Sequence, residues 1–580
     1  MDKIQVSENY IQLVTDARAP SHEFLHLIEN YKDVYRMSRM PGTYRCSIRM
    51  LPEVLSVMRN ITLVEQITNQ TIRDFYTTEM TRRSMTAELL QNGSTDTTID
   101  TRLWGHQRLG VELARYNKRF NFFYDTRTGK TPMALAIMRS AIADGSIKRA
   151  LVVTPSSIIP DWLGDAKKFY PELKVVAYHG TAQDKYRALH TPCHIFIIST
   201  NMLADNLWML KQLNFGMCFF DESSKLKNKS SKTSEAAFDL SQHIERWYNL
   251  SATPAPNGQY EYFTQMRTVD PYAFHPVWTH FVNKYFDDLS KSRKYQKLVI
   301  KPYMLEEFMS KVKEYSLYVD QKVMPIAPKE WIPVYYDLQT SERALYTTMA
   351  EDMFVEIGDK VLTASMSAIM RAKLNQLTKG FVLDTEAIKE NKYAKMLGDD
   401  PQGVEVLRLF PRGRATAIQK LAEVLQCQEL RDERCIIWAN YAQEFADIQD
   451  LLGDRCRIIR GGTPGKVRDT FIADFRAGRF QYLVAHPLSI GMGLNLTCSH
   501  IAIYYSLNDS WEALKQSSER ICGHITIQPK TCKYYIIMAK DTVNEIIYDN
   551  LKNKRDMSTG FLEHLKAVSL YGLTEGKQGT

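Results

Sequence analysis

The sequence predicts an α/β protein in which two doubly wound lobes, each built on a parallel sheet, follow one another along the chain. Short apolar runs alternate with helical patterns over residues 101–257 and again over residues 415–540. Such alternation is typical of βαβ units and therefore of parallel sheets. We expect a small α+β domain over residues 1–100, a helix-rich linker or insertion over residues 258–414, and a helical brace and tail over residues 541–580.

The composition is that of a globular protein. Of the 580 residues, 44% are hydrophobic and 24% are charged, an ordinary balance for folded domains. No apolar run is long enough to span a bilayer, and the N-terminus lacks the layout of a signal peptide. Nine scattered cysteines without a CxxC pair indicate a reducing compartment and argue against a zinc site. A formal net charge of +8 favours a polyanionic partner.

The N-terminal region combines strand and helix patterns. Two apolar runs, Ile4–Val6 and Tyr10–Val14, predict a hairpin, and the alternating residues from Tyr44 to Met50 predict a further strand. Helices are expected near Glu23–Met37 and within Ile61–Leu90. A polar stretch then links this region to the first lobe.

Apolar runs mark the strands of the two lobes. In the first lobe they are Phe120–Tyr124, Ala150–Val153, His194–Ser199, Gly216–Phe220 and Trp247–Leu250. In the second lobe they are Cys435–Trp438, Cys456–Ile459, Tyr482–Ala485, Ile501–Tyr505 and Tyr534–Met538. A basic run around Lys294 is either a solvated helix face, the commoner case, or a contact to phosphates. A final helix is expected over Thr542–Leu565.

The chain between Tyr124 and Thr131 has the layout of a phosphate-binding loop. An apolar strand leads into a tight turn, and Gly129-Lys130-Thr131 opens a helix. Backbone N–H groups at a helix N-terminus attract anions, while Lys130 would reach the β- and γ-phosphates and Thr131 would hold Mg²⁺. The full pattern GxxxxGK[ST] requires a Gly at position 124, where Tyr stands. The alternative is an ordinary helix N-terminus with an exposed lysine.

Two acids end another apolar strand. Asp221 and Glu222 follow Gly216–Phe220, and the carboxyl ends of parallel strands open onto the ligand crevice. Asp221 can hold Mg²⁺ there through water, and Glu222 can orient and deprotonate the attacking water. Alone, such a pair is usually a helix cap. Ser251 and Thr253 follow the next strand, where their hydroxyls can sense the γ-phosphate region, unless they only form a turn.

Three further patterns are weak alone and gain meaning from their order. Gln107 precedes the phosphate loop and could read the edge of an adenine. Gly491–Leu496 is a glycine-rich turn after a strand. Arg520, which closes a Gln516-x-x-x-Arg pattern, could reach across a cleft and stabilise charge on the transferred phosphoryl group.

With these motifs in order, the chain resembles the Swi/Snf family of superfamily 2 helicase-like ATPases, in particular its compact bacterial and phage members. The resemblance runs from about residue 100 to about residue 565. Gly491–Thr497 is similar to the family's motif V, and Asp221–Asn228 resembles its DEAH-x-LKN box with Ser-Ser for Ala-His. Leu151–Ser156 and Leu250–Asn257 look like motifs Ia and III. The N-terminal region loosely resembles the small substrate-recognition domain of annealing members.

The resemblance implies two RecA-like lobes, ATP and Mg²⁺ as cofactors, and roles for the residues that match the motifs. Catalysis is expected from Lys130, Asp221, Glu222 and Arg520. ATP is expected to contact Gln107, Arg127, Thr128, Gly129, Lys130, Thr131, Gly493 and Arg520, with Mg²⁺ on Thr131 and Asp221. Coupling is expected from Ser251, Thr253 and Gln516, and DNA contacts from Pro155, Ser156, Thr200 and Lys294.

Two positions depart from the family pattern. The family has Gly where Arg127 stands, so the loop is either tighter or carries an extra cation. The family also has a second Arg three residues after Arg520, the usual finger, where this chain has Gly523 followed by His524. Either Arg520 serves alone or the loop is remodelled, and the rate of hydrolysis depends on which.

The function implied by the resemblance is ATP-driven translocation on double-stranded or branched DNA, with ATP hydrolysed between the lobes, for fork remodelling or strand annealing. We expect an intracellular monomer, in the cytoplasm or nucleoid, or in the host cytoplasm if the protein is viral. Two alternatives stay open. One is a strand-separating DNA or RNA helicase, and the other is a nucleotide-gated DNA-binding module with weak hydrolysis, which Gly523 suggests.

Overall fold

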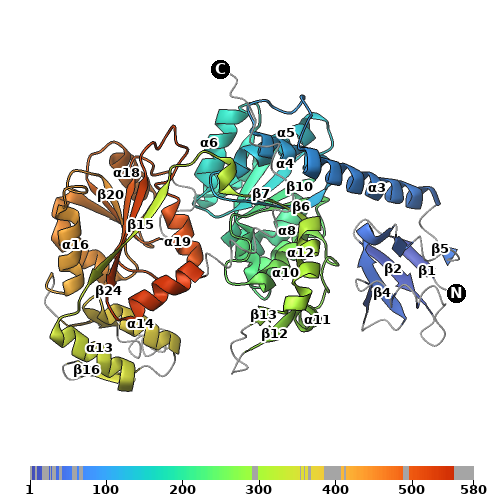
Figure 1. Ribbon diagram of the computed structural model, residues 1–580. Helices are drawn as coiled ribbons and strands as arrows, with labels where there is room; N and C mark the ends of the chain where they lie inside the picture. Colours follow the sequence, from blue (N-terminus) through green and yellow to red (C-terminus); the bar gives the residue numbers. More distant parts are fainter. Residues whose placement is uncertain are drawn as a thin grey trace. The chain divides into compact units, whose positions relative to one another are not determined.

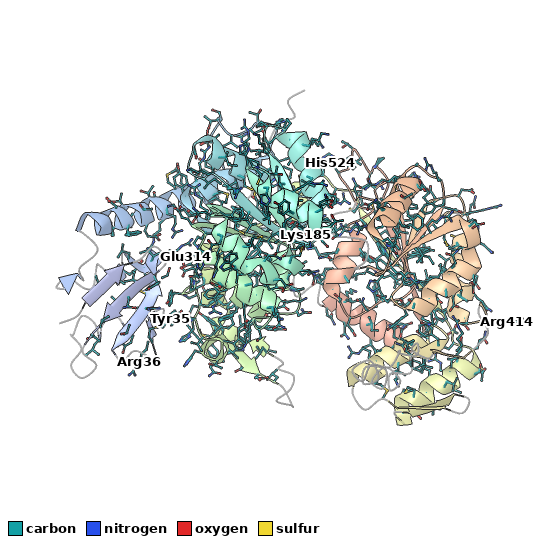
Figure 2. The ribbon with its side chains drawn as sticks, turned by 180° about the vertical axis from the view of Figure 1, so that it is seen from behind. Tyr35, Arg36, Lys185, Glu314, Arg414 and His524 are labelled. Atoms are coloured by element: carbon teal, nitrogen blue, oxygen red, sulfur yellow. The ribbon has the colours of Figure 1, made fainter. Side chains whose placement is uncertain are left out.

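The computed structural model of the protein describes residues 69–289, 298–383 and 406–553, with gaps at 353, 358–359, 364–366, 410–412 and 488–494, and parts of residues 3–63. These residues fall into two compact units, Met1–Met324 and Pro325–Met557 (Figure 1). Each unit holds one large parallel sheet flanked by helices, which confirms the predicted tandem of two doubly wound, RecA-like lobes. Figure 2 shows the side chains from behind, among them Glu314 of the first unit and His524 of the second.

The first unit is built on a seven-stranded parallel sheet of order β14-β6-β11-β10-β7-β9-β8. Nearly every residue of its inner strands is buried, as expected when helices cover both faces of a parallel sheet. The strands are β6 Arg119–Tyr124, β7 Ala150–Thr154, β8 Val175–Tyr178, β9 Ile195–Ser199, β10 Met217–Asp221, β11 Arg246–Leu250 and β14 Ser316–Val319.

Three helices of this unit, α6, α7 and α9, begin where the sequence supplies a side-chain cap or a proline. Thr181 caps α7 in a capping box, and Pro160 occupies the first turn of α6, where its missing N–H costs nothing. The helices are α4 Gly105–Tyr116, α5 Lys130–Ala143, α6 Ile159–Phe169, α7 Ala182–His190, α8 Leu207–Gln212, α9 Lys232–Ser241, α10 Tyr262–Val269, α11 Trp278–Tyr285 and α12 Leu305–Glu314; a short hairpin, β12 Phe286–Asp288 and β13 Leu298–Ile300, precedes α12.

A separate sheet of order β3-β4-β2-β1-β5 lies at the N-terminus, followed by the long helix α3, Asn69–Asn92. The predicted hairpin is confirmed by the antiparallel pairing of β1 and β2. The helix predicted near Glu23–Met37 is wrong at its end, because Tyr35 and Arg36 pair with β4 as a strand; most of its other residues lie outside the described part of the chain. The strands are β1 Lys3–Val6, β2 Tyr10–Val14, β3 Tyr35–Arg36, β4 Thr43–Ser47 and β5 Thr62–Leu63.

The second unit is built on a six-stranded parallel sheet of order β15-β24-β23-β20-β22-β21. Its strands are β15 Lys329–Tyr336, β20 Cys435–Trp438, β21 Cys456–Ile459, β22 Tyr482–Ala485, β23 Ile501–Tyr504 and β24 Cys532–Ala539. Its helices are α13 Thr340–Asp352, α14 Ser367–Leu377, α16 Thr416–Gln426, α17 Ala442–Leu452, α18 Gly465–Arg476 and α19 Trp511–Ser518. A further helical stretch runs over residues 543–553. Two small hairpins are formed by β16 Phe354–Ile357 with β17 Lys360–Thr363, and by β18 Phe381–Leu383 with β19 Val406–Arg408.

The segment predicted as a separate insertion, residues 258–414, instead belongs to both units. Its β14 completes the first sheet and its β15 forms an edge of the second. Neither strand has the unbroken apolar pattern on which the prediction relied, because β14 begins with Ser316 and β15 contains Lys329, Glu330 and Pro333. A proline is tolerated at a sheet edge because the missing N–H is not needed for pairing there.

All nine cysteines are described and all are free thiols. Among the described residues, we find no helix with the length and apolar character to cross a bilayer.

Candidate functional site

Most of the predicted site residues of the first unit follow the carboxyl ends of strands. The phosphate loop follows β6, Pro155 and Ser156 follow β7, Thr200 follows β9, Glu222 follows β10, and Ser251 with Thr253 follows β11. Because all of these strands are parallel, their carboxyl ends meet at one edge of the sheet. The structure therefore brings these residues to a common edge.

The phosphate loop turns tightly between β6 and α5. Gly129 has a φ of 80°, and Arg127 has a φ of 62°, a left-handed conformation that costs a non-glycine residue about 1–2 kcal/mol. The Thr128 hydroxyl donates to the Asp125 carbonyl at 2.7 Å and closes the turn. A glycine would adopt this conformation at position 127 without that cost.

Lys130 begins α5 and points back across this loop. Its Nζ donates to the carbonyl oxygens of Tyr124 at 3.0 Å and of Asp125 at 3.4 Å. Neither acceptor carries a net charge, so a phosphate oxygen would form a stronger, charge-assisted bond with the same ammonium group. A bound anion could therefore replace the two carbonyl oxygens as the hydrogen-bond partner of Lys130.

The tyrosine at the position of the missing glycine faces the core. Tyr124 is fully buried, and its hydroxyl donates to the His106 carbonyl at 2.6 Å. Its side chain therefore links the end of β6 to the start of α4 by a hydrogen bond.

The first turn of α4 supports the phosphate loop from behind. His106 Nε2 lies 2.7 Å from the Thr128 carbonyl, and burial lowers the pKa of His106, so the ring is a neutral donor. Gln107 Nε2 donates to the carbonyls of Thr128 and Gly129, both at 3.2 Å, and its Oε1 accepts from the Trp104 amide at 2.8 Å. A Cβ at Gly129 would lie 1.9 Å from Gln107 Nε2. The amide predicted to read adenine is thus engaged by the loop itself.

Asp221 ends β10 with its carboxylate fixed by three donors. Its Oδ2 accepts from Thr154 Oγ1 and from Trp162 Nε1, both at 3.0 Å, and its Oδ1 accepts from the Glu222 amide at 3.0 Å. Glu222 has a φ of 52°, and a 3₁₀ turn over Ser223–Lys227 follows it. Strained left-handed residues outside glycine concentrate at functional sites.

The donor set at this edge suits Mg²⁺. Mg²⁺ prefers oxygen ligands and is usually held by one or two carboxylates together with water and substrate phosphates. The Thr131 hydroxyl and the Asp221 carboxylate are of this kind. Oδ1 of Asp221 accepts one bond and keeps an acceptor site, whereas Oδ2 already accepts two. The residues therefore fit the ion that the motifs imply.

A glutamine that the sequence patterns did not reveal joins the acidic turn to the Ser251–Pro254 turn. Gln265, on α10, accepts from Ser223 Oγ at 2.7 Å and donates to the Pro254 carbonyl at 2.6 Å. The Thr253 amide donates to Ser251 Oγ at 3.1 Å. Such contacts between residues distant in sequence leave no periodic signal.

Three hydroxyls at the same edge are buried and have no hydrogen-bond partner among the described residues: those of Thr200, Ser224 and Thr253. A buried unpaired hydroxyl is costly and often marks a place for water or ligand. Of the predicted DNA contacts, Ser156 is exposed, whereas Thr200 is buried and offers little surface to a phosphate backbone. Lys294 lies outside the described residues.

In the second unit, Arg520 follows α19 and is mostly buried. Its amide donates to the Ser517 carbonyl at 3.1 Å, and its carbonyl accepts from the Leu496 amide at 2.9 Å. Gln516 Nε2 donates to Glu512 Oε1 at 3.3 Å. Gly493 lies outside the described residues.

The loop after Arg520 is packed closely around Gly523. A Cβ at this position would lie 2.8 Å from Thr497 Cγ2. The Gly523 carbonyl accepts from the Ala327 amide at 3.0 Å, and the Ile525 amide donates to the Pro325 carbonyl at 2.8 Å. A side chain at position 523 would therefore require a local shift of Thr497.

Comparison with known proteins gives two family matches. The SNF2-related domain matches residues 58–390, and the helicase conserved C-terminal domain matches residues 416–522. The chain is 23% identical over 475 residues to YwqA of Bacillus subtilis, whose name describes it as an ATP-dependent helicase/translocase. It is also 23% identical over 483 residues to protein p41 of Acyrthosiphon pisum secondary endosymbiont phage 1. Both matches cover 77% of this chain, but 48% of YwqA and 95% of p41.

Among solved structures, the chain is similar to the Sulfolobus solfataricus SWI2/SNF2 ATPase core in complex with dsDNA. The two are 17% identical, the TM-score is 0.35, and the match covers 83% of this chain and 97% of that one.

Proposed function

The chain belongs to the SNF2-related family of helicase-type ATPases, as its motifs predicted, and on that premise we propose that it hydrolyses ATP to move along double-stranded DNA. The observation that carries the proposal is the carboxyl edge of the first sheet. There the phosphate loop with Lys130 follows β6, and the acids Asp221 and Glu222 stand at the end of β10, with only β11 between the two strands. A phosphate-binding cation, a metal-binding carboxylate and a base for water are the parts that ATP hydrolysis needs.

In the proposed reaction, the residues of this edge act on ATP and on the attacking water. Lys130 leaves the carbonyls of Tyr124 and Asp125 and binds the β- and γ-phosphates. Glu222 orients the water and accepts its proton as the water attacks the γ-phosphorus. The bond from the γ-phosphorus to the β–γ bridging oxygen breaks, and ADP and phosphate are released. Bound Mg²⁺, held by Thr131 and Asp221, would neutralise charge that develops on the phosphate oxygens.

Ser251 and Thr253 are proposed to report the state of the nucleotide. Gln265 supports this role, since it joins their turn to the turn that follows Glu222. A change at the γ-phosphate that moves Glu222 would be transmitted through Ser223 and Gln265 to the second turn.

Arg520 is proposed to stabilise the charge on the transferred phosphoryl group, with Gln516 coupling that contact to the lobe. The close packing at Gly523 supports a single-arginine arrangement, because no cation can occupy that position without moving Thr497.

Duplex DNA is the proposed track, supported by the net charge of +8 and by the translocase named among the relatives. We further propose that branched DNA is acted on in fork remodelling or strand annealing, and that the protein works as a monomer inside the cell. Because the chain spans 48% of YwqA, that relative's own activity does not define the activity of this chain.

ATPase assays with single-stranded, duplex and forked DNA test this proposal. Stimulation by duplex DNA is the expected result, with further stimulation by a fork if branched DNA is the substrate. Stimulation by single strands alone would favour the strand-separating helicase. A basal rate that no DNA changes would favour the nucleotide-gated binding module.

A further inference from the structure

A cavity of about 560 Å³ lies in the first unit between the N-terminal sheet, α3 and the turn from α12 to β14. It is at the edge of the large sheet opposite the phosphate loop. Arg49, which lines it, donates through Nη2 to the carbonyl of Arg119, the first residue of β6, at 3.3 Å, whereas Lys130 follows the other end of β6. A six-residue strand spans about 17 Å. The cavity is therefore separate from the proposed ATP site.

Positive charge predominates in the lining of this cavity, and its volume is that of ligand-binding pockets in general. The charged residues that line it are the cations Arg49, Arg82, Arg83, Lys311 and Lys313 and the acids Glu53 and Glu314. A concave wall with an excess of one charge concentrates the field and attracts the opposite charge. An anionic ligand is the expected occupant.

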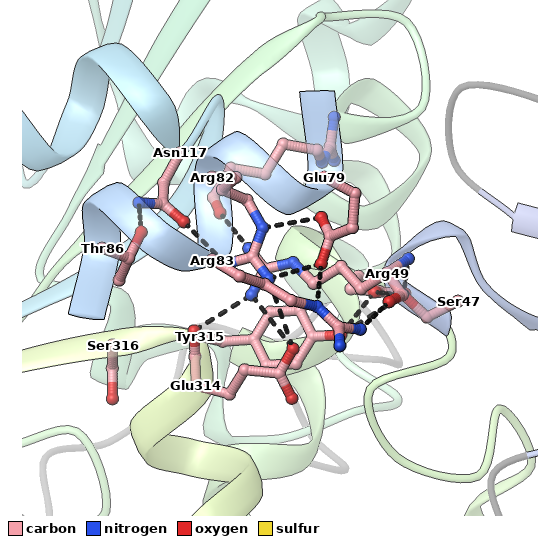
Figure 3. A network of polar contacts seen from close by, with 12 residues as sticks. Ser47, Arg49, Glu79, Arg82, Arg83, Thr86, Asn117, Glu314, Tyr315 and Ser316 are labelled. Atoms are coloured by element: carbon pink, nitrogen blue, oxygen red, sulfur yellow. Dashed lines mark hydrogen bonds and ion pairs between the residues drawn. The ribbon is translucent and has the colours of Figure 1, made fainter. Parts of the chain in front are cut away.

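Two of these arginines, Arg49 and Arg82, are mostly buried and make several contacts with neighbouring residues (Figure 3). Arg82 donates from Nε and Nη2 to the two carboxylate oxygens of Glu79, both at 2.7 Å, and from Nη1 to Asn117 Oδ1 at 3.2 Å. Arg49 lies 3.8 Å from the centre of the Tyr315 ring and donates to the Glu314 carbonyl at 3.0 Å. Because the guanidinium groups are already ordered, a ligand that contacts them loses little extra entropy.

The Glu314 carboxylate occupies the place between these two arginines without hydrogen bonding to either. Its Oε1 lies 3.6 Å from Arg49 Nη1 and 3.7 Å from Arg82 Nη2, and its side chain is 43% exposed. The two arginine side chains are only 9% and 10% exposed, but both distances exceed hydrogen-bonding length, so these ion pairs are weaker than direct contacts. A phosphate oxygen, with more charge and more acceptor sites, would be favoured in the same place.

From these contacts we propose that the cavity binds a phosphate group, which displaces the Glu314 carboxylate and lies between Arg49 and Arg82. The neighbouring Lys311 and Lys313 add positive charge at the rim. The phosphate belongs either to a small phosphorylated molecule or to a nucleic-acid backbone, and the chemistry of recognition is the same. Binding here does not require ATP at Lys130.

Calorimetric titration with inorganic pyrophosphate tests the site in the full-length Lys130→Ala protein, in which the phosphate loop is impaired. Glu314→Gln removes the competing carboxylate charge and should tighten pyrophosphate binding about 1.4- to fivefold, the range expected for exposed ion pairs. The double substitution Lys311→Gln with Lys313→Gln should weaken binding by a similar factor. Lys148→Gln, at an exposed lysine that does not line the cavity, should leave the affinity unchanged.

Opposite shifts in the two variants support the site. The absence of pyrophosphate binding, or equal affinities in all variants, would overturn it. A short DNA duplex added to the pyrophosphate complex then identifies the source of the phosphate: competition that Glu314→Gln strengthens assigns a nucleic-acid backbone, and lack of competition assigns a small phosphorylated ligand. Neither arm uses ATP turnover, so failure of the proposed ATPase function would be seen separately.

Discussion

In the candidate site of the first unit, Lys130 has neutral hydrogen-bond partners that a charged ligand can replace, and Thr253 has a hydroxyl to which a ligand can bond. Lys130 donates to two backbone carbonyls, and the buried Thr253 hydroxyl has no partner among the described residues. Asp221, in contrast, is already fixed by Thr154 and Trp162. The Asp221 carboxylate is therefore already held in one orientation, whereas the Lys130 ammonium group can exchange its partners for a ligand.

Substitutions at Lys130 and Glu222 should separate binding from chemistry. Lys130→Ala removes the charge-assisted contact to the phosphates and should weaken ATP binding by about 1.5–3 kcal/mol. Glu222→Gln keeps the shape of the side chain but not the base, so ATP should still bind while turnover falls about 10²–10⁴-fold. Titration with ATP and steady-state ATPase rates measure the two effects. Parental turnover in either variant would refute the role assigned to that residue.

We expect position 129 to require Gly both for its left-handed backbone and for its closeness to Gln107. Gly145, in the same unit, shares only the first feature and serves as a control. Gly145 has a φ of 76° with nothing within 4 Å of where a Cβ would lie, so Gly145→Ala should lose only the conformational cost of about 1–2 kcal/mol. Gly129→Ala has the same backbone cost and also collides with Gln107. It should lose more stability in denaturant unfolding and should lose ATP affinity, which Gly145→Ala should retain. Equal losses in both variants would show that the contact between Gln107 and the loop is unimportant.

At the scale of elements, the loop after α19 decides whether the missing arginine limits the enzyme. Gly523→Arg should not raise turnover, because its Cβ meets Thr497, and overpacking of this kind typically costs about 1–3 kcal/mol. Gly462→Ala is the matched control, since nothing lies within 4 Å of a Cβ there. Arg520→Ala should lower turnover about 10³-fold with a smaller effect on ATP affinity. Faster hydrolysis by Gly523→Arg, or a fully active Arg520→Ala, would contradict this account of the second unit.

The elements that the sequence predicted best are the strands buried on both faces. β20 and β22 have the predicted bounds because their residues form unbroken apolar runs. The edge strand β21 also has the predicted bounds, although Arg457 interrupts its apolar run. β8, whose four residues are all only partly buried at the sheet edge, and β15, which contains Pro333, lack that signal. Their pairing depends on neighbouring strands far away in sequence.

The same limit applies to the candidate site. Motifs predicted Lys130, Asp221 and Glu222, because phosphate loops and acidic strand ends have local patterns. Gln265 and Trp162 were not predicted, since each acts through a partner more than 40 residues away, Ser223 and Asp221 respectively. The hydrogen bond from Thr154 to Asp221 likewise joins residues more than 40 positions apart in the sequence.

At the scale of the whole molecule, the predicted motifs are divided between the two units, so neither unit is expected to translocate alone. In the proposed mechanism, the two units together convert ATP hydrolysis into movement on DNA. Binding to duplex through phosphates should weaken steeply with salt, with a log–log slope of about −0.9 per phosphate neutralised. Fluorescence anisotropy over a salt series measures that slope, and a flat response would argue against a phosphate-backbone track.

The central claim is movement along intact duplex driven by ATP. Displacement of a third strand from a triplex-bearing duplex measures this directly, because the third strand is removed by a motor that tracks the duplex, whether or not the duplex strands separate. The expected result is release of the third strand with ATP, no separation of the duplex, and no release by the Glu222→Gln variant. Duplex separation with ATP would identify a strand-separating helicase instead, and release of neither strand despite DNA binding would contradict translocation.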